Sequence, residues 1–139
     1  MFWKVLRRVR AHSKKDGVIS KTFGPHLTLD LYGCDKKKLN DHELLFKLLD
    51  ELPGKIGMHK FSEPIVHLIP PRENSFDQGG VTGFVILVES HISIHTFPAD
   101  GFASIDIFSC KSFNSKFFGF TLVSKQNALN LYVFMHMFK

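Results

Sequence analysis

The residues most able to do chemistry lie where two apolar, β-branched-rich runs meet, at the polar group Glu89-Ser90-His91. A hairpin commonly places Asn-Gly or Asp-Gly at such a junction, whereas this one contains neither Gly nor Pro. By that standard Glu89-Ser90 is a poor turn pair. The junction therefore indicates that something other than turn formation selected these residues.

His91, Ser93 and His95 occupy alternate positions after the junction, so they share one face of an extended strand. Residues 104–110 predict a further strand, which ends in the thiol of Cys110. Two imidazoles and a thiol could bind zinc. The spacing is not diagnostic, no fourth ligand is evident, and eight histidines make a chance cluster easy. A zinc-binding module is therefore an alternative of little weight.

The stretch Glu-Ser-His-Ile-Ser-Ile-His-Thr-Phe-Pro from residue 89, followed by Ile-Asp-Ile-Phe-Ser-Cys ending at residue 110, resembles S-adenosylmethionine decarboxylase of the short prokaryotic type. The resemblance runs from about Phe23 to Cys110, and its Glu-Ser-His-(x)3-His core is far more specific than a lone three-residue motif. In that family the peptide bond before the serine cuts itself and the serine becomes a pyruvoyl group. The resemblance therefore implies self-cleavage between Glu89 and Ser90.

The resemblance also implies a role for each of several side chains. Ser90 would attack the carbonyl of Glu89 and become the pyruvoyl group that takes the substrate amine as a Schiff base. His95 matches the family's processing histidine, and Cys110 matches its proton donor. Thr82 stands where the family usually has a serine that helps processing. Considered alone, His95 is more typical of a histidine that is only hydrogen-bonded within a strand. Considered alone, Cys110 is more typical of a small buried apolar residue. Within the motif, the catalytic roles of both residues are favoured.

Two further residues are implied in substrate binding. Phe76, in a polar loop, matches a family phenylalanine that stacks on the adenine of the substrate, and an aromatic face also attracts a sulfonium cation. After Pro98 the family usually has a glutamate that holds the ribose hydroxyls, but this sequence has Ala99. Asp100 could replace that glutamate if the turn directs it inward, and it is equally typical of a plain turn residue.

By resemblance, then, the chain is a self-processing, pyruvoyl-dependent carboxy-lyase that converts S-adenosylmethionine to S-adenosyl-methioninamine and CO2 for spermidine and other polyamines. It would need neither pyridoxal phosphate nor a metal, and a homodimer of processed heterodimers is implied, with adenine bound at the subunit boundary. The alternative is a catalytically impaired homologue that acts as a dimer partner or regulatory subunit, as Thr82 and Ala99 suggest.

Composition is consistent with a single globular domain of 139 residues, since 44% are hydrophobic and 15 are Phe. The net charge of +5 belongs to residues 1–22, which hold seven Lys or Arg against Asp16 alone, leaving 11 basic and 12 acidic residues elsewhere. This distribution argues against nucleic-acid binding. No secretory signal or membrane span is predicted. Two distant cysteines favour a reduced, cytoplasmic protein.

The elements that must position the chemistry follow from local patterns. Alternation predicts strands over 26–34, 62–69, 102–110 and the two runs beside the junction, with a polar loop at 71–80 and a turn at 98–101. A loop carries Lys36, Lys37 and Lys38. Asn40 and Glu43 then predict a capping box for a leucine-striped helix that ends at Pro53-Gly54.

We therefore predict an α+β fold, a two-layer sandwich of an antiparallel sheet with helices on one face and a second copy on the other. Residues 1–22 form a basic tail, 23–110 the decarboxylase-like domain, and 111–139 a divergent C-terminal segment. That segment alternates over 118–122 and 129–137, which predicts a hairpin rather than the amphipathic helix that the resemblance implies.

Overall fold

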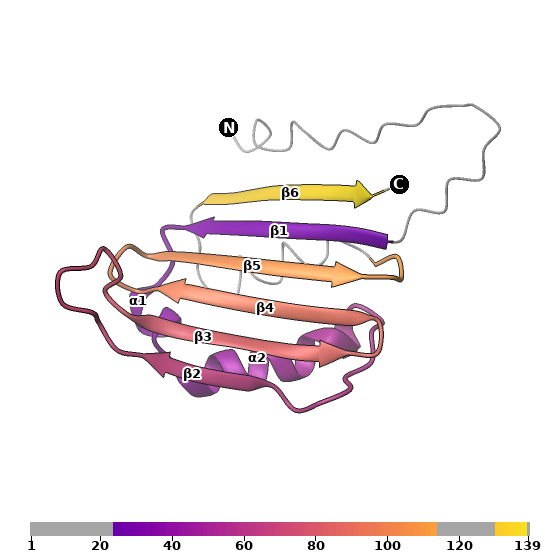
Figure 1. Cartoon of the computed structure of the whole chain (residues 1–139), viewed down its shortest axis with the longest axis horizontal. Helices are drawn as coiled ribbons and strands as arrows, with labels where there is room; N and C mark the ends of the chain where they lie inside the picture. Colours follow the sequence, from indigo (N-terminus) through magenta and orange to yellow (C-terminus); the bar gives the residue numbers. More distant parts are fainter. Residues whose placement is uncertain (1–23, 114–129, 139) are drawn as a thin grey trace.

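The chain forms a six-stranded antiparallel sheet with two helices against one of its faces (Figure 1). This computed structural model describes residues 24–113 and 130–138. The elements in chain order are β1 (Gly24–Tyr32), α1 (Lys36–Leu39), α2 (His42–Lys55), β2 (Ile65–Ile69), β3 (Gly80–Leu87), β4 (Ser90–Phe97), β5 (Phe102–Ser109) and β6 (Asn130–Phe138). The predicted two-layer α+β sandwich is confirmed.

The sheet mixes the two halves of the chain, because its strand order is β2-β3-β4-β5-β1-β6. β1, β2 and β3 precede the Glu89–Ser90 bond, and β4, β5 and β6 follow it. β1 is inserted between two strands of the second half: Leu29 pairs with Ile105 of β5 on one side and with Val133 of β6 on the other. Figure 1 shows β1, in indigo, between β5 in orange and β6 in yellow.

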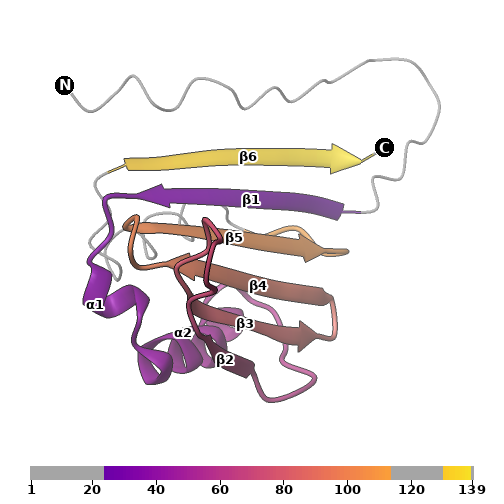
Figure 2. The same ribbon diagram turned by 60° about the vertical axis from the view of Figure 1, so that its left-hand side comes forward.

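The core lies between the sheet and the helices. Leu27, Leu29 and Leu31 of β1 have no exposed surface, so alternate residues of the strand face the helical layer. The buried face of α2 meets them with residues spaced by three or four positions, namely Leu45, Leu48, Leu49 and Leu52. Complete burial of one leucine contributes about 1.5–3 kcal/mol. Figure 2 shows that both helices lie on this one side of the sheet.

Lys36, Lys37 and Lys38 belong to the short helix α1, so the predicted loop is wrong at this point. The carboxylate of Asp35 accepts hydrogen bonds from the backbone N–H groups of Lys37 (2.9 Å) and Lys38 (3.2 Å) and thereby caps the first turn. Leu39 is fully buried and anchors the turn to the core.

The start of α2 corrects the predicted capping box. Asp41 is the N-cap, and its carboxylate accepts a hydrogen bond from the backbone N–H of Leu44 (2.9 Å). Asn40 instead closes α1, where its own N–H bonds to the carbonyl oxygen of Lys37 (3.2 Å). Two adjacent residues are both good caps, and the turn that Asp35 begins shifts the helix start by one position.

The end of α2 also lies beyond the predicted stop at Pro53-Gly54. The helix continues to Lys55, with Pro53 buried in its last turn. The turn closes because the N–H of Ile56 bonds to the carbonyl oxygen of Leu52 (3.2 Å) and the N–H of Met58 bonds to that of Pro53 (2.9 Å). The chain then leaves the helix directly toward the β3–β4 junction.

Thr96 connects the helical layer to the sheet. Its side chain is buried, and its hydroxyl donates to the carbonyl oxygen of Leu39 (2.8 Å) and accepts from the N–H of Val81 (2.8 Å). A buried hydroxyl is stable only when it is hydrogen-bonded in this way. Thr96 therefore sets how α1 sits against β3 and β4.

The second face of the sheet carries polar and aromatic side chains. His91, Ser93 and His95 point to it, since Ile92 and Ile94 between them are buried against the helices. The prediction that these three residues share a face is confirmed. Large apolar side chains reach the same face in β3, where Phe84 pairs with Ser93 and is 39% exposed. Neither of the helices in the described ranges is long and apolar enough to cross a membrane.

The C-terminal prediction is confirmed in part, because residues 130–138 form a strand. That strand pairs with β1 over its whole length, from Asn130 against Tyr32 to Phe138 against Gly24. The other predicted half of the hairpin, at 118–122, lies outside the described residues, as does the basic tail at 1–22.

Candidate active site

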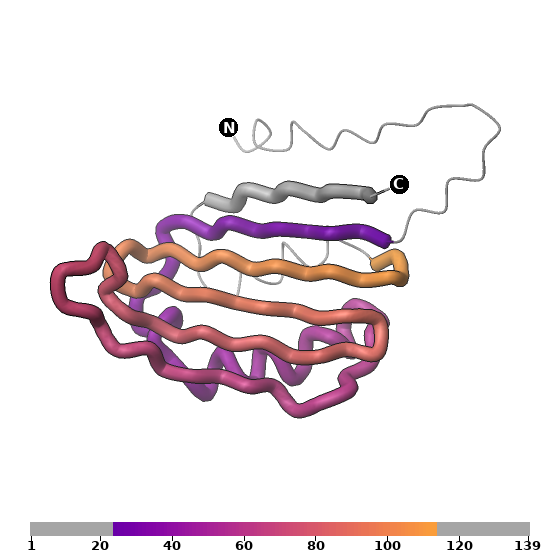
Figure 3. Tube along the Cα trace, viewed as in Figure 1, coloured from indigo at the N-terminus to yellow at the C-terminus, as the bar shows by residue number. Residues whose placement is uncertain are grey.

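The candidate cleavage junction is a two-residue link between β3 and β4. Leu87 pairs with Ser90, so only Val88 and Glu89 join the two strands, and the tube in Figure 3 shows the chain reversing there. Ser90 has a φ angle of 148°, a conformation that residues with a side chain rarely adopt. Among the described residues other than glycine, only Asn74 shares a positive φ. The backbone is therefore strained at the residue that the motif marks as reactive.

Glu89 is held by its carboxylate. The side chain is buried, and it accepts hydrogen bonds from the backbone N–H of His59 (3.0 Å) and from Nδ1 of the His59 ring (2.7 Å). These donors, the backbone N–H first and the ring second, lower the pKa of Glu89 below its ordinary value of 4.5. The carboxylate is consequently ionised and acts only as an acceptor.

The carbonyl of Glu89 is held from the other side by β5. Its oxygen accepts a hydrogen bond from the backbone N–H of Cys110 (2.9 Å), while Ser90 pairs with Ser109. The Ser109 hydroxyl fixes this end of β5, since it donates to the carbonyl oxygen of Lys111 (2.8 Å) and accepts from its N–H (3.0 Å). Three of the predicted site residues, Glu89, Ser90 and Cys110, are thus brought together.

The thiol of Cys110 is exposed, unlike that of Cys34. Cys110 follows the last residue of β5, and the interpretation as a small buried apolar residue is therefore wrong for it. Cys34 is buried near the core, and its burial raises the thiol pKa to about 11. An accessible thiol next to the junction is the one able to exchange a proton with a bound molecule.

Thr82 and His95 form a second cluster on the open face. They are paired neighbours on β3 and β4, and the Thr82 hydroxyl lies 3.2 Å from Nδ1 of His95. Along β4, however, His95 is five residues from Ser90, which corresponds to roughly 16 Å at about 3.3 Å per residue. Within one chain the structure therefore does not bring the imidazole to the serine.

The two residues implied in substrate binding lie outside both clusters. Phe76 is 89% exposed in the loop between β2 and β3. Asp100 is exposed in the predicted turn, which is confirmed by its N–H bonding to the carbonyl oxygen of Phe97 (3.1 Å) and by the φ of 62° at Gly101. The roles of Phe76 and Asp100 in binding stay predictions.

Sequence reasoning missed two residues that contact the predicted site. Asp106 of β5 binds His91 through Oδ1 (3.0 Å to Nε2) and His26 through Oδ2. His59 lies in the segment after α2, thirty residues before Glu89. Alternation along 104–110 could have placed Asp106 on the open face. No local pattern marks His59.

The zinc alternative requires His91, His95 and Cys110 to gather, and they do not. His91 is bonded to Asp106, whereas His95 lies beside Thr82. Over residues 24–113, no group of three or more His, Cys, Asp or Glu side chains is arranged to hold a metal ion.

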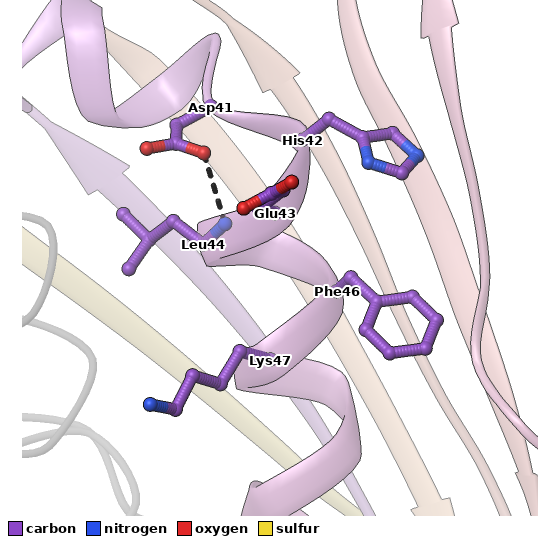
Figure 4. Close-up of a pocket in the computed structure, with 6 residues that line it drawn as sticks. All are labelled: Asp41, His42, Glu43, Leu44, Phe46 and Lys47. Atoms are coloured by element: carbon purple, nitrogen blue, oxygen red, sulfur yellow. Dashed lines mark hydrogen bonds between the residues drawn. The ribbon is translucent and has the colours of Figure 1, made fainter.

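A shallow hollow lies on the helical layer, away from both clusters (Figure 4). Its lining is a single stretch around the start of α2, made of Asp41, His42, Glu43, Leu44, Phe46 and Lys47. In Figure 4 His42 and Phe46 point to one side of the helix and the Asp41 cap faces the other. None of the predicted site residues lines it.

Comparisons with known proteins agree with the motif. The sequence profile of the family described as S-adenosylmethionine decarboxylase matches residues 25–128. The S-adenosylmethionine decarboxylase proenzyme of Caldicellulosiruptor saccharolyticus is 40% identical over 87 residues, which are 63% of this chain and 64% of that protein. The proenzyme of Methanococcus aeolicus is 40% identical over 90 residues, which are 65% of this chain and 70% of that protein.

A solved structure gives the same result at the level of the fold. The adenosylmethionine decarboxylase from Aquifex aeolicus superposes with a TM-score of 0.71 at 30% identity, covering 86% of this chain and 92% of that one. The matched region spans just under two thirds of the Caldicellulosiruptor proenzyme. From the profile match, which covers most of its length, the chain belongs to the S-adenosylmethionine decarboxylase family.

Proposed function

We propose that the chain cuts itself between Glu89 and Ser90 and then decarboxylates S-adenosylmethionine, supplying the aminopropyl donor for spermidine and other polyamines. The observation that carries the proposal is the backbone at the junction. A serine at a φ of 148° follows a carbonyl that the N–H of Cys110 holds at 2.9 Å, and both lie in the Glu-Ser-His-(x)3-His motif.

The self-cleavage uses atoms that the junction already holds. The hydroxyl oxygen of Ser90 adds to the carbonyl carbon of Glu89, and the C–N bond breaks to leave an ester and a free amine at residue 90. The N–H of Cys110 supports the negative charge that develops on the carbonyl oxygen. A base then removes the α-proton of residue 90, and the Cβ–O bond breaks. This releases the main-chain carboxylate of residue 89, which becomes the C-terminus of the first piece. Water hydrolyses the remaining dehydroalanine to a pyruvoyl group and ammonia.

A pyruvoyl group at residue 90 supplies an electron sink for the loss of CO2 without an external cofactor. The residues present fit such a group. Residue 90 begins β4 beside Ser109, where the neighbouring strand holds its backbone. The exposed thiol of Cys110 is adjacent, and it would return a proton to the α-carbon of the product.

His95, with Thr82 beside it, is the proposed processing base, but its distance along β4 excludes action on Ser90 of the same chain. We therefore place the two clusters together across a homodimer, in which the open faces of two sheets meet and the His95–Thr82 pair of one copy serves Ser90 of the other. Phe76 and Asp100 are exposed, as residues that contact the adenosyl group at such a boundary must be before the copies assemble.

Intact-mass measurement of the purified full chain tests the proposal. The expected species are residues 1–89 and a pyruvoyl-capped 90–139, with CO2 released from S-adenosylmethionine labelled at its carboxyl carbon. The Ser90→Ala variant should remain whole and release none. A wild-type chain that stays intact after prolonged incubation would contradict the proposal. A chain that by itself releases no CO2 but binds an active relative would instead be the impaired partner subunit. Ala99, at the position where the family usually has glutamate, favours that alternative.

A further inference from the structure

The segment that follows α2 passes beside the β3–β4 junction and forms hydrogen bonds with both residues of the link, Val88 and Glu89. His59 provides three contacts there. Its carbonyl oxygen accepts from the N–H of Val88 (2.9 Å), its own N–H donates to Oε2 of Glu89 (3.0 Å), and its ring Nδ1 lies 2.7 Å from Oε1. Since an ionised carboxylate can only accept hydrogen bonds, Nδ1 of the His59 ring carries a hydrogen and is the donor.

These contacts immobilise residue 89 from the side opposite β5. The carboxylate is fixed by His59, and the carbonyl oxygen is fixed by the N–H of Cys110 (2.9 Å). Rotation about the bond between the α-carbon and the carbonyl carbon of Glu89 would break one of these hydrogen bonds. The strained φ of Ser90 can persist only where its surroundings determine the backbone in this way.

We propose that His59 is a positioning residue for the cleavage of the Glu89–Ser90 bond. It touches none of the reacting atoms and acts through Glu89, whose carbonyl carbon it holds in place for the attack. Small errors in the placement of reacting groups slow intramolecular reactions strongly. The His59 side chain is 72% exposed, so its ion pair with Glu89 contributes little to global stability. The inference rests on the proposed self-cleavage.

The test compares two substitutions of nearly equal size. His59→Asn retains an N–H donor at the position of Nδ1, and His59→Leu removes it. Full-length chains made by cell-free translation are sampled over time, and the fraction cleaved is read from gels and intact mass. A lost hydrogen bond to a charged group predicts cleavage about tenfold slower for the Leu variant. The Asn variant should stay within about threefold of wild type, since it keeps that bond.

His42 offers a matched control, since its ring Nε2 bonds to the carbonyl oxygen of Val66 (3.0 Å) far from the junction. His42→Leu should cleave at the wild-type rate. Each substitution is also made with Ser90→Ala, and thermal melting of these uncut chains separates a folding defect from a slow reaction. If His59→Leu does not fold, His59→Gln replaces it. The glutamine amide reaches beyond the Nδ1 position, so the Gln variant should cleave more slowly than the Asn variant.

Cleavage of the Leu variant at the wild-type rate would overturn the role of His59 and leave the proposed function intact. An Asn variant as slow as the Leu variant, with both folded, would overturn it too, since the donor would then not matter. A wild-type chain that never cleaves would remove the proposed function itself and with it this inference.

Discussion

Backbone strain at Ser90 can be measured without the proposed reaction, by comparing Ser90→Gly with Ser90→Ala. Neither variant can cleave, because both lack the hydroxyl. Alanine keeps the side-chain carbon that makes a φ of 148° unfavourable, and glycine does not. Backbone strain of this kind costs about 1–3 kcal/mol. Glycine costs about 0.5–1 kcal/mol relative to alanine in a strand. The Gly variant should therefore be more stable by up to about 2.5 kcal/mol, or up to roughly 10 °C in Tm.

Ser93 provides the internal reference for this comparison. It lies on the same strand, and it is not among the described residues with a positive φ. At this position the order should reverse, with Ser93→Gly less stable than Ser93→Ala by about 0.5–1 kcal/mol. Urea denaturation of all four chains, with the Ser93 pair made on Ser90→Ala, gives the two differences. If the alanine variant is the more stable one at both positions, the junction stores no strain and the reasoning is refuted.

Three other properties of the chain lead to measurable outcomes. Thr96→Val should lower the free energy of unfolding by about 2 kcal/mol, because it leaves buried backbone partners without a hydrogen bond; an unchanged urea midpoint would contradict this. Native protein should take up one iodoacetamide at Cys110 at pH 8, since the pKa of buried Cys34 is about 11; rapid labelling of both thiols would argue against that burial. The pKa of Glu89 is lower in the folded protein than its ordinary value of 4.5. The hydrogen bonds of the ionised Glu89 carboxylate therefore contribute fully to stability above about pH 4.5, and this contribution is lost as pH falls through the pKa of the folded state. The stability difference between Ser90→Ala chains with Glu89 and with Glu89→Gln should therefore narrow below about pH 4.5, and a difference that widens in acid would contradict the assignment.

The sequence predicted best what local alternation encodes. The shared face of His91, Ser93 and His95 follows from a strand period of two, and neighbouring isoleucines make the buried side unambiguous. The fold class followed because strands and helices are segregated along the chain. The helix start was less certain, since Asn40 and Asp41 are both good caps and only the geometry of α1 decides between them.

For the candidate site, the sequence proposes residues but not how they are arranged. A motif names Ser90 and His95, but only the strand pairing shows that one chain holds them roughly 16 Å apart. His59 contacts Glu89 across 30 residues, a separation that no local pattern spans, and Asp106 contacts His91 across 15 residues. The φ of Ser90 is likewise invisible, because serine gives no local preference for that conformation.

The interleaved strand order has a mechanical consequence for maturation. A cut in the link between β3 and β4 would yield two polypeptides, each of which contributes three strands to the sheet. β1 of the first polypeptide would lie between β5 and β6 of the second and pair with both. Neither piece could diffuse away unless the three pairings between them, β3–β4, β5–β1 and β1–β6, were broken. Once they were broken, recovery would be a second-order encounter of two chains, dependent on their concentration, whereas the uncut chain folds alone. A cut at this bond would therefore have to follow folding, because the separated pieces would refold less readily than the intact chain.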